Sequence, residues 1–446
     1  MEKTKESQRG QFGTKLGFII ACVGSAVGMA NIWMFPYRTG KFGGAAFLIP
    51  YFIFVVLLGF SGVIGEMAFG RSMKTGPLGA FGKAMKLRFG EKYEKPGRVI
   101  GIIPVLGSLG IAIGYSVVVG WVLKYLFSAL TGELISIENM GAFFGELTGN
   151  FGSVGWHMLA LVMTFAIMAM GISKGIEKVN KIMMPVFFIF FILLMFRVMT
   201  LPGAAEGYQY LFVPNWEQLL DVKTWVYALG QAFFSLSLAG SGTVVYGSYL
   251  KDDVDVVSSA KNVAIFDTLA ALLAGMVVIP AVFAFGMDVA SGPPLMFITL
   301  PAVFQQMPFG TIFAVIFFAA VLFAAITSLM NLFETPIEAL QEQFGLSRIA
   351  AVIIVAVVGA AISIFIENGD AVSTWMDIIS IYVIPLGALL AGIMFFWVCP
   401  KGFAKEQSEL GRKKKLGKWF VPLTKYVFVG ITLIVYILGI FFGGIG

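Results

Sequence analysis

Histidine, cysteine and charged residues are scarce in this 446-residue chain. A single histidine, His157, rules out a metal centre built from several histidines, and HExxH metalloenzyme motifs are absent. The two cysteines, Cys22 and Cys399, both lie in apolar runs, which indicates neither a disulfide framework nor a thiolate metal site. Only 13% of the residues are charged, about half the share of a soluble domain. The composition therefore argues against a soluble protein and against an enzyme.

Long apolar runs fill the chain instead, and 58% of its residues are hydrophobic. Runs of this length can cross a hydrocarbon core of about 30 Å. The first run is too long and too rich in glycine for a cleavable signal peptide. The sequence thus predicts an all-α polytopic membrane protein with eleven spans, near residues 15–37, 43–70, 98–128, 156–173, 179–200, 225–249, 258–287, 309–343, 348–366, 373–399 and 418–442.

Basic residues alternate between the two sides of the predicted membrane. Most of the 31 Lys and Arg residues fall before span one or in the loops after spans two, four, six, eight and ten. This pattern predicts a cytoplasmic N-terminus, an extracellular C-terminus and a plasma-membrane (inner-membrane) location. The net charge of +6 is then explained by basic loops that set the topology and lie beside membrane lipid. Nucleic acid is not expected as a partner. The run 412–415 is a topology signal on this interpretation, and a specific anionic-lipid site is the alternative.

Two spans carry breaks where a bilayer normally demands regular helix. Span one contains Gly24, Gly28 and Asn31, and span six contains the run 239–242, Ala-Gly-Ser-Gly. Unpaired backbone groups are costly in hydrocarbon, so breaks are tolerated where they line a binding cavity. Gly24 and Gly28 also form a GxxxG pattern, for which close helix packing is the simpler explanation. Paired breaks in two repeat halves favour a transporter substrate site.

The second break lies five spans after the first, in span six, which predicts two related five-helix halves in inverted orientation around a site near the midplane. Alternating access follows when one bundle rocks against the rest. The expected segments are a cytoplasmic N-terminal segment 1–14, a first repeat 15–200, an extracellular loop 201–224, a second repeat 225–399 with a re-entrant loop 288–308, a basic loop 400–417 and a last helix 418–446.

Oxygen-bearing side chains cluster in the spans that could hold a desolvated alkali cation. Such cations prefer carbonyl, hydroxyl, amide and carboxylate oxygens. Asp267 is the strongest candidate, because burying an ionisable side chain deep in a membrane span costs free energy and by default indicates a functional role. The other candidates are Asn31, Ser235, Ser237, Thr327 and Ser328.

Each candidate also has a simpler explanation. Asp267 could instead lie near the cytoplasmic end of its span beside Lys261, and the Thr327 hydroxyl could bond back to the preceding turn. Glu66 is either a boundary charge near Arg71 or an acceptor for unwound backbone. His157, at the start of span four, is expected to lie at the membrane interface without a role.

Five segments, residues 24–36, 43–50, 65–71, 231–237 and 323–328, together closely resemble the neurotransmitter:sodium symporter family in its bacterial eleven-span branch. The resemblance covers nearly the whole chain. It implies a leucine-transporter-like fold of five plus five helices, with helices one and six unwound at mid-membrane. It also implies two bound sodium ions. The first would be held by Ala26, Asn31, Ser235 and Asp267 together with the substrate carboxylate, and the second by Gly24, Val27, Ala324, Thr327 and Ser328.

The same resemblance implies the substrate site. The carboxylate would meet the Met29 and Ala30 amides and the Tyr115 hydroxyl, with the ammonium near Ala26, Phe234, Ser235 and Ser237. The side chain would lie among Ile111, Phe234, Leu329 and Leu332.

Departures from the family pattern refine these expectations. Gly28 stands where monoamine carriers have an aspartate, which favours amino acids over amines. Asp267, aligned with a usual asparagine by way of a one-residue gap, could supply the charge that chloride gives in animal relatives, so chloride-independent transport is expected. Gly240 and Ser241 replace an aromatic cap, which leaves room for large aliphatic and aromatic side chains.

The gates are also expected from the resemblance. Met34 replaces the usual outer-gate arginine opposite Asp377, so outer closure would depend more on Trp33, Tyr115 and Phe234. The inner gate would pair Arg9 with Glu342, beside Phe12 and Tyr249. In span five, Gly175 and Pro185 mark an end that can unwind and release the second ion inward.

The sequence therefore predicts a symporter that carries two sodium ions and one hydrophobic amino acid per cycle. A proton-coupled permease of the same fold is the alternative, with Asp267 and Glu66 as its titratable groups. A channel would need a continuous pore lined with rings of ligands. The sequence leaves open whether the chain forms a homodimer.

Overall fold

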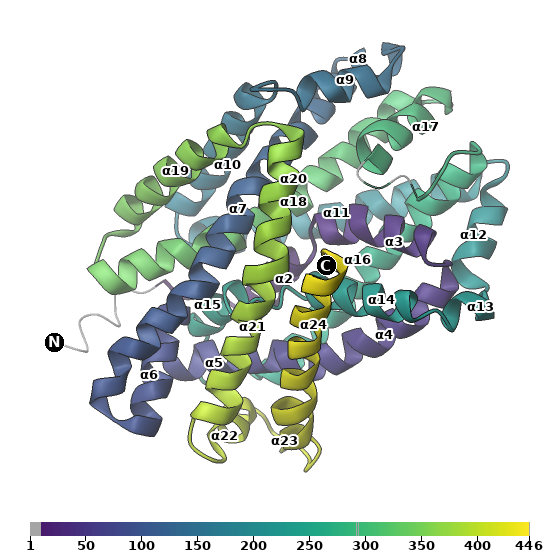
Figure 1. The fold of residues 1–446 in the computed structure, drawn as a ribbon. Coiled ribbons are helices and arrows are strands. Elements are labelled where there is room, and N and C mark those ends of the chain that lie inside the picture. Colours follow the sequence, from purple (N-terminus) through teal and green to yellow (C-terminus); the bar gives the residue numbers. More distant parts are fainter. Residues whose placement is uncertain (1–9, 291, 293, 446) are drawn as a thin grey trace.

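The protein is an assembly of long, mutually tilted helices (Figure 1). The computed structural model describes residues 10–290, 292 and 294–445, and this part of the chain contains helices and no strands. The two cysteines are both buried and unpaired, as the sequence predicted.

The first half of the chain contains two long continuous helices, α7 and α11, and a first helix that is broken near its middle. The elements are α2 (Lys15–Ala26), η1 (Ala30–Met34), α3 (Phe35–Lys41), α4 (Ala45–Leu58), η2 (Gly59–Val63), α5 (Ile64–Met73), α6 (Pro77–Phe89), η3 (Glu91–Tyr93), α7 (Glu94–Leu130), α8 (Glu133–Ser136), α9 (Met140–Leu147), α10 (Val154–Ala169), η4 (Ile172–Glu177) and α11 (Lys178–Met199).

In the second half, the first predicted span is also broken, into α14 and α15. Its elements are α12 (Ala204–Phe212), α13 (Trp216–Leu219), α14 (Val222–Ser235), α15 (Gly242–Ser248), α16 (Val256–Ala284), η5 (Leu295–Thr299), α17 (Leu300–Gln306), α18 (Gly310–Phe344), α19 (Arg348–Phe365), α20 (Gly369–Ile378), η6 (Ile379–Val383), α21 (Ile384–Ile393), η7 (Met394–Val398), α22 (Phe403–Glu409), α23 (Phe420–Pro422), η8 (Leu423–Phe428) and α24 (Val429–Phe442).

Eight helices of the described chain are long and apolar enough to cross a membrane, and nine if α2 and the bent segment after it count as one. The predicted span four corresponds to the shorter α10, and span six to the broken pair α14 and α15. The chain is thus a multi-pass membrane protein, and the count of eleven stays a prediction.

Buried and lipid-facing helices differ in their packing. The α2 helix lies inside the molecule and packs against α11, α16 and α18. By contrast, α19 exposes Ile349, Ile353 and Val357 at four-residue intervals, which form an apolar stripe on one face. A stripe of this kind is expected where a helix faces lipid rather than water.

The end of the chain returns to the middle of the fold. After α24, Ile445 is buried against α14, where its carbonyl oxygen would lie 1.8 Å from a Cβ added to Gly230. Arg38 of α3 donates a 2.6 Å hydrogen bond to that carbonyl. This contact connects the end of the chain to α3, the second half of span one.

Candidate functional site

The first predicted break is present in span one. The α2 helix ends at Ala26, and Val27 is extended (φ −72°, ψ 105°). The helix resumes at Ala30 after a bend of 53°. Asn31 stabilises the break, because its Oδ1 accepts a 3.0 Å hydrogen bond from the Gly28 amide.

The second predicted break is present in span six. The α14 helix ends at Ser235 and α15 begins at Gly242. Between them, Ser237 and Gly240 have positive φ values of 54° and 66°. Gly240 has no room for a side chain, because an added Cβ would lie 2.3 Å from the Gly387 carbonyl oxygen. The span is therefore forced out of helical geometry at this point.

Glu66 holds the unwound part of span six. Its Oε1 accepts hydrogen bonds from the amides of Ala239 (3.2 Å) and Gly240 (2.8 Å). Of its two open interpretations, the structure supports the one in which Glu66 bonds the backbone. Arg71 does not pair with Glu66 and donates instead to backbone carbonyls, including that of Val254.

Three side chains from three helices meet between the breaks. Asn31 donates through Nδ2 to Ser235 Oγ (3.1 Å) and to Asp267 Oδ1 (2.8 Å). Ser235 donates to Asp267 Oδ2 (2.7 Å). All three residues are fully buried. Asp267 therefore belongs to this cluster and does not lie beside Lys261 at the helix end.

The cluster contains a carboxylate, a hydroxyl and the Asn31 amide, whose Nδ2 faces the other two groups while its Oδ1 accepts from Gly28, and no histidine or thiol lies among them. This donor set suits a hard monovalent or divalent cation rather than a transition metal. The described residues include no group of three or more His, Cys, Asp or Glu placed to hold a metal. An ion bound here would meet one carboxylate and otherwise neutral groups.

Span eight contributes hydroxyls on the other side of the first break. The Thr327 hydroxyl donates to the carbonyls of Phe323 and Ala324 (both 3.0 Å), which is the local bond that the simpler explanation predicts. Ser328 reaches span one with a 3.4 Å bond to the Ser25 carbonyl. Both hydroxyl oxygens keep lone pairs for a further partner.

Residues assigned to the substrate lie around the first break. The Tyr115 hydroxyl accepts a 3.2 Å bond from the Met29 amide, and Gln231 donates to the Ala30 carbonyl (2.9 Å). Leu329 is fully buried in the core. Three further residues assigned to the side-chain pocket are partly buried against the same core, namely Ile111, Phe234 and Leu332.

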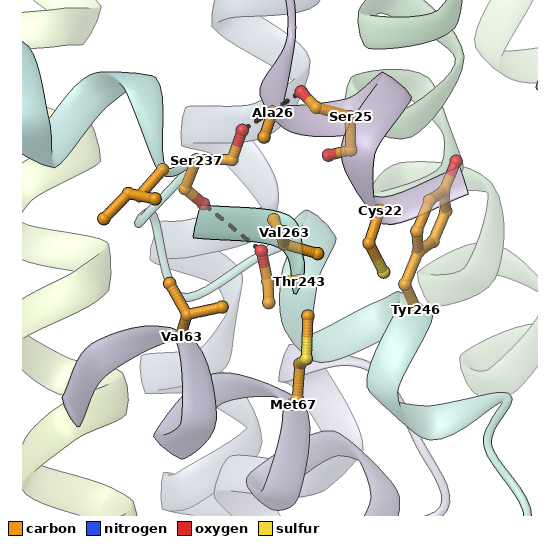
Figure 2. A pocket seen from close by; sticks show the side chains of 10 residues that line it. Cys22, Ser25, Ala26, Val63, Met67, Ser237, Thr243, Tyr246 and Val263 are labelled. Atoms are coloured by element: carbon orange, nitrogen blue, oxygen red, sulfur yellow. Dashed lines mark hydrogen bonds between the residues drawn. The ribbon is translucent and has the colours of Figure 1, made fainter. Parts of the chain in front are cut away.

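A small cavity lies where the two breaks approach each other, and Figure 2 shows Cys22, Ser25, Thr243 and Tyr246 around it. Its volume of about 10 Å³ is roughly that of one water-sized probe. Ser237 bridges the breaks by donating to the Ser25 carbonyl (3.1 Å), and Thr243 donates to the Ser237 carbonyl (3.3 Å). The two unwound segments are thus bonded directly to each other.

An aromatic contact lies at the end of span one that the sequence predicts to be extracellular. Trp33 meets Phe297 of η5 edge to face, with ring centroids 6.3 Å apart. This contact brings η5 against span one. Asp377 forms no ion pair within the described part of the chain.

Aromatic rings and ion pairs occupy the opposite end, which the sequence predicts to be cytoplasmic. Phe12 packs edge to face against Tyr246 and Tyr249, with centroid distances of 5.5 and 6.3 Å. Arg9, the expected partner of Glu342, lies outside the described residues. Glu342 forms a 3.0 Å ion pair with Arg98.

A second ion pair at this end was not predicted from the sequence. Arg348 pairs with the buried Glu334 in span eight through both carboxylate oxygens, with a 2.7 Å contact to Oε2. Tyr249 donates to the same carboxylate (2.7 Å). The signal was available, because Glu334 is an ionisable residue inside an apolar run.

His157 requires a correction. It was expected at the interface without a role, but it is fully buried, with Nδ1 2.7 Å from Glu367 Oε2 and Nε2 2.9 Å from Ser116 Oγ. This network joins α7, α10 and the turn between α19 and α20. A lone histidine at the start of a span gave no sign of these partners.

Span five begins with a wide helical turn. Residues Ile172–Glu177 form a π-helical turn that contains Gly175, and Pro185 lies inside α11. Adding a Cβ to Gly175 would bring it within 2.2 Å of the Ile167 carbonyl oxygen. The helix is wound here, so its unwinding stays a prediction.

The fold and site define a membrane transporter built on paired broken helices that face a buried oxygen cluster. The model of the sodium:neurotransmitter symporter family matches residues 9–144 and 136–438, and the chain belongs to this family. It is therefore a sodium-coupled symporter and not an enzyme.

Relatives agree with this assignment. The chain is 39% identical to an uncharacterised sodium-dependent transporter, YhdH, of Bacillus subtilis (strain 168), over 73% of this chain and 71% of the relative. It is 29% identical to an uncharacterised sodium-dependent transporter of Haemophilus influenzae, over 98% of this chain and 100% of the relative. The crystal structure of MhsT in complex with L-phenylalanine matches with a TM-score of 0.86 and 34% identity, covering 96% of this chain and 99% of that one. The leucine-transporter-like fold with helices one and six broken is thereby confirmed.

Proposed function

We propose that this symporter imports hydrophobic amino acids, both large aliphatic and aromatic, across the plasma membrane by alternating access. The observation that carries the proposal is the buried cluster of Asn31, Ser235 and Asp267 between two helix breaks. The similarity to MhsT, which was solved with L-phenylalanine, supports the substrate class. The distribution of basic residues supports a cytoplasmic N-terminus and an extracellular C-terminus.

Two sodium ions accompany each substrate in this proposal. The first is held by the Ala26 carbonyl with Asn31, Ser235 and Asp267, and the substrate carboxylate completes its shell, so that ion and substrate bind together. Two net charges moving inward would each contribute about 2.3 kcal/mol per 100 mV of membrane potential.

The second ion is held between span one and span eight. Its ligands are the carbonyls of Gly24, Val27 and Ala324 and the hydroxyls of Thr327 and Ser328. The Ser328 bond to the Ser25 carbonyl supports this assignment, since it brings the hydroxyl to the edge of the break.

The substrate carboxylate binds the Met29 and Ala30 amides and the Tyr115 hydroxyl. Gly28 leaves the substrate to supply its own carboxylate, which favours amino acids over amines. The fixed charge of Asp267 makes chloride unnecessary, because a carboxylate beside the first sodium ion does the work of a mobile anion.

Reconstitution in liposomes tests the proposal. Labelled leucine, tryptophan and phenylalanine should accumulate under an inward sodium gradient, and replacing sodium by choline at fixed pH should stop their uptake. Uptake that persists in choline and follows a pH gradient would contradict sodium coupling and favour a proton-coupled permease.

A further inference from the structure

An amide oxygen without a hydrogen-bond partner lies beside the proposed second sodium site. Asn180 of α11 is fully buried, and its Nδ2 donates to the Ile176 carbonyl (2.8 Å). Its Oδ1 has no partner in the described chain. A buried acceptor left unpaired is destabilising, so this oxygen is poised to accept a ligand.

The oxygen points at span one. A Cβ built on Gly24 would lie only 2.0 Å from Asn180 Oδ1, so the absence of a side chain on Gly24 is what lets the amide approach. The same Cβ would lie 3.1 Å from the Thr327 Cβ. Asn180, Gly24 and Thr327 therefore converge from three helices, and the last two are among the proposed ligands of the second ion.

A second oxygen of α11 enters the same face of span one nearer the cytoplasm. A Cβ built on Gly17 would lie 2.0 Å from Glu177 Oε1. Gly17 and Gly24 are two turns apart on α2, about 10 Å along the helix axis. On span five, Glu177 and Asn180 are one turn apart and lie on the same face of the helix. Two glycine notches on span one thus receive two oxygens from span five.

Glu177 opens onto the cytoplasmic side. It accepts hydrogen bonds from the Gly13 amide (2.6 Å), the Thr14 hydroxyl (2.9 Å) and Lys181 (2.6 Å). These residues line an open pocket of about 540 Å³ at the beginning of α2 and η4. Asn180 therefore lies beside the proposed ion site, and Glu177, one turn away on the same helix face, lines this pocket.

We propose that the Asn180 amide oxygen is a transient ligand for the sodium ion that leaves the second site inward, and that the Glu177 carboxylate is the next oxygen on the same path. The proposal rests on the proposed second sodium site. When the end of span five loosens at its π-helical turn, the Asn180 oxygen, which has no hydrogen-bond partner, coordinates the ion. The ion then crosses the contact between α2 and α11 with protein oxygens in place of the water that it has lost.

Matched variants of the full chain test the proposal. Asn180→Leu keeps about the same volume without an oxygen, and Asn180→Asp keeps the shape with an added charge. In Asn180→Leu we expect net uptake into sodium-free vesicles to fall about tenfold, the effect of roughly 1.4 kcal/mol on a barrier. Equilibrium binding of labelled phenylalanine, and its half-saturating sodium concentration, should stay within a factor of two. Ile182→Ala, on an exposed part of the same helix, should change neither quantity.

Asn180→Asp should lower the half-saturating sodium concentration several-fold, because a carboxylate replaces a neutral oxygen on the ion path. Thermal unfolding of each variant shows whether it is folded. Unchanged net uptake in Asn180→Leu, or an equal loss of binding and uptake, would overturn the proposal. Wild-type protein that binds substrate without any sodium dependence would instead refute the proposed function itself.

Discussion

The two proposed sodium sites differ in what holds them together. The first contains a carboxylate, and Asn31, Ser235 and Asp267 are fully bonded to one another. The second has only neutral ligands, and the Thr327 hydroxyl donates its hydrogen bond to backbone carbonyls of its own helix. The second also borders the contact of α2 with α11, where span five begins with a wide turn.

This contrast indicates a division of labour. A charged and mutually bonded cluster is preorganised and holds its ion with the substrate. A neutral site beside a deformable helix end binds more weakly and is suited to releasing its ion first. The following substitutions break or sharpen that comparison.

The largest effect is expected from Asp267→Ala. It removes the only charge of the first site and leaves the Ser235 hydroxyl donor unpaired, at about 1–3 kcal/mol, whereas Asn31 keeps its bonds to Ser235 Oγ and to the backbone carbonyl of residue 267. Sodium-driven uptake should fall at least about hundredfold. Liposome uptake measures the loss, and wild-type uptake with gluconate in place of chloride serves as the companion test. A wild-type rate that collapses without chloride would contradict the role given to Asp267.

Glu66→Ala should have the next largest effect. Glu66 accepts two amide bonds from the unwound part of span six, and its removal strands the amides of Ala239 and Gly240. Hydrogen bonds to a charged group are worth about 1.5–3 kcal/mol each, so we expect uptake to fall more than about tenfold. Glu66→Gln keeps an acceptor and should retain most of the activity. Equal loss in both variants would mean that the charge, not the bonding, matters.

Ser328→Ala should weaken the second site selectively. Loss of one hydroxyl ligand, worth about 1 kcal/mol, should raise the half-saturating sodium concentration several-fold and leave substrate affinity at saturating sodium unchanged. Sodium titration of phenylalanine binding measures both. A substrate affinity that falls with the sodium affinity would place Ser328 in the first site's network.

Trp33→Ala should have the smallest effect. The Trp33 contact with Phe297 contributes about 0.5–1.5 kcal/mol beyond buried area. We expect faster escape of bound substrate to the outside, by a few-fold, with sodium dependence unchanged. Dissociation of labelled phenylalanine in sodium measures this, and Trp33→Phe provides the matched control. An altered sodium requirement would contradict a role confined to outer closure.

Much of the fold could be predicted because membranes penalise irregular backbone. Both breaks, the depth of Asp267 and the absence of a disulfide followed from apolar runs and their interruptions. The partners of His157 and of Glu334 could not be predicted, since Glu367 reaches His157 from a turn far along the chain and Arg348 meets Glu334 only through the packing of α19 against α18. The notch that Gly24 provides for Asn180 was likewise invisible, because a glycine in a helix reveals nothing about which side chain approaches it.

The most direct test measures the radiolabelled sodium and the labelled phenylalanine taken up together by the same proteoliposomes at zero membrane potential. The account predicts two sodium ions per amino acid in the wild type, and loss of coupled flux of both labels in Asp267→Ala. Amino-acid uptake with no accompanying sodium, or a wild-type ratio left intact by Asp267→Ala, would contradict it.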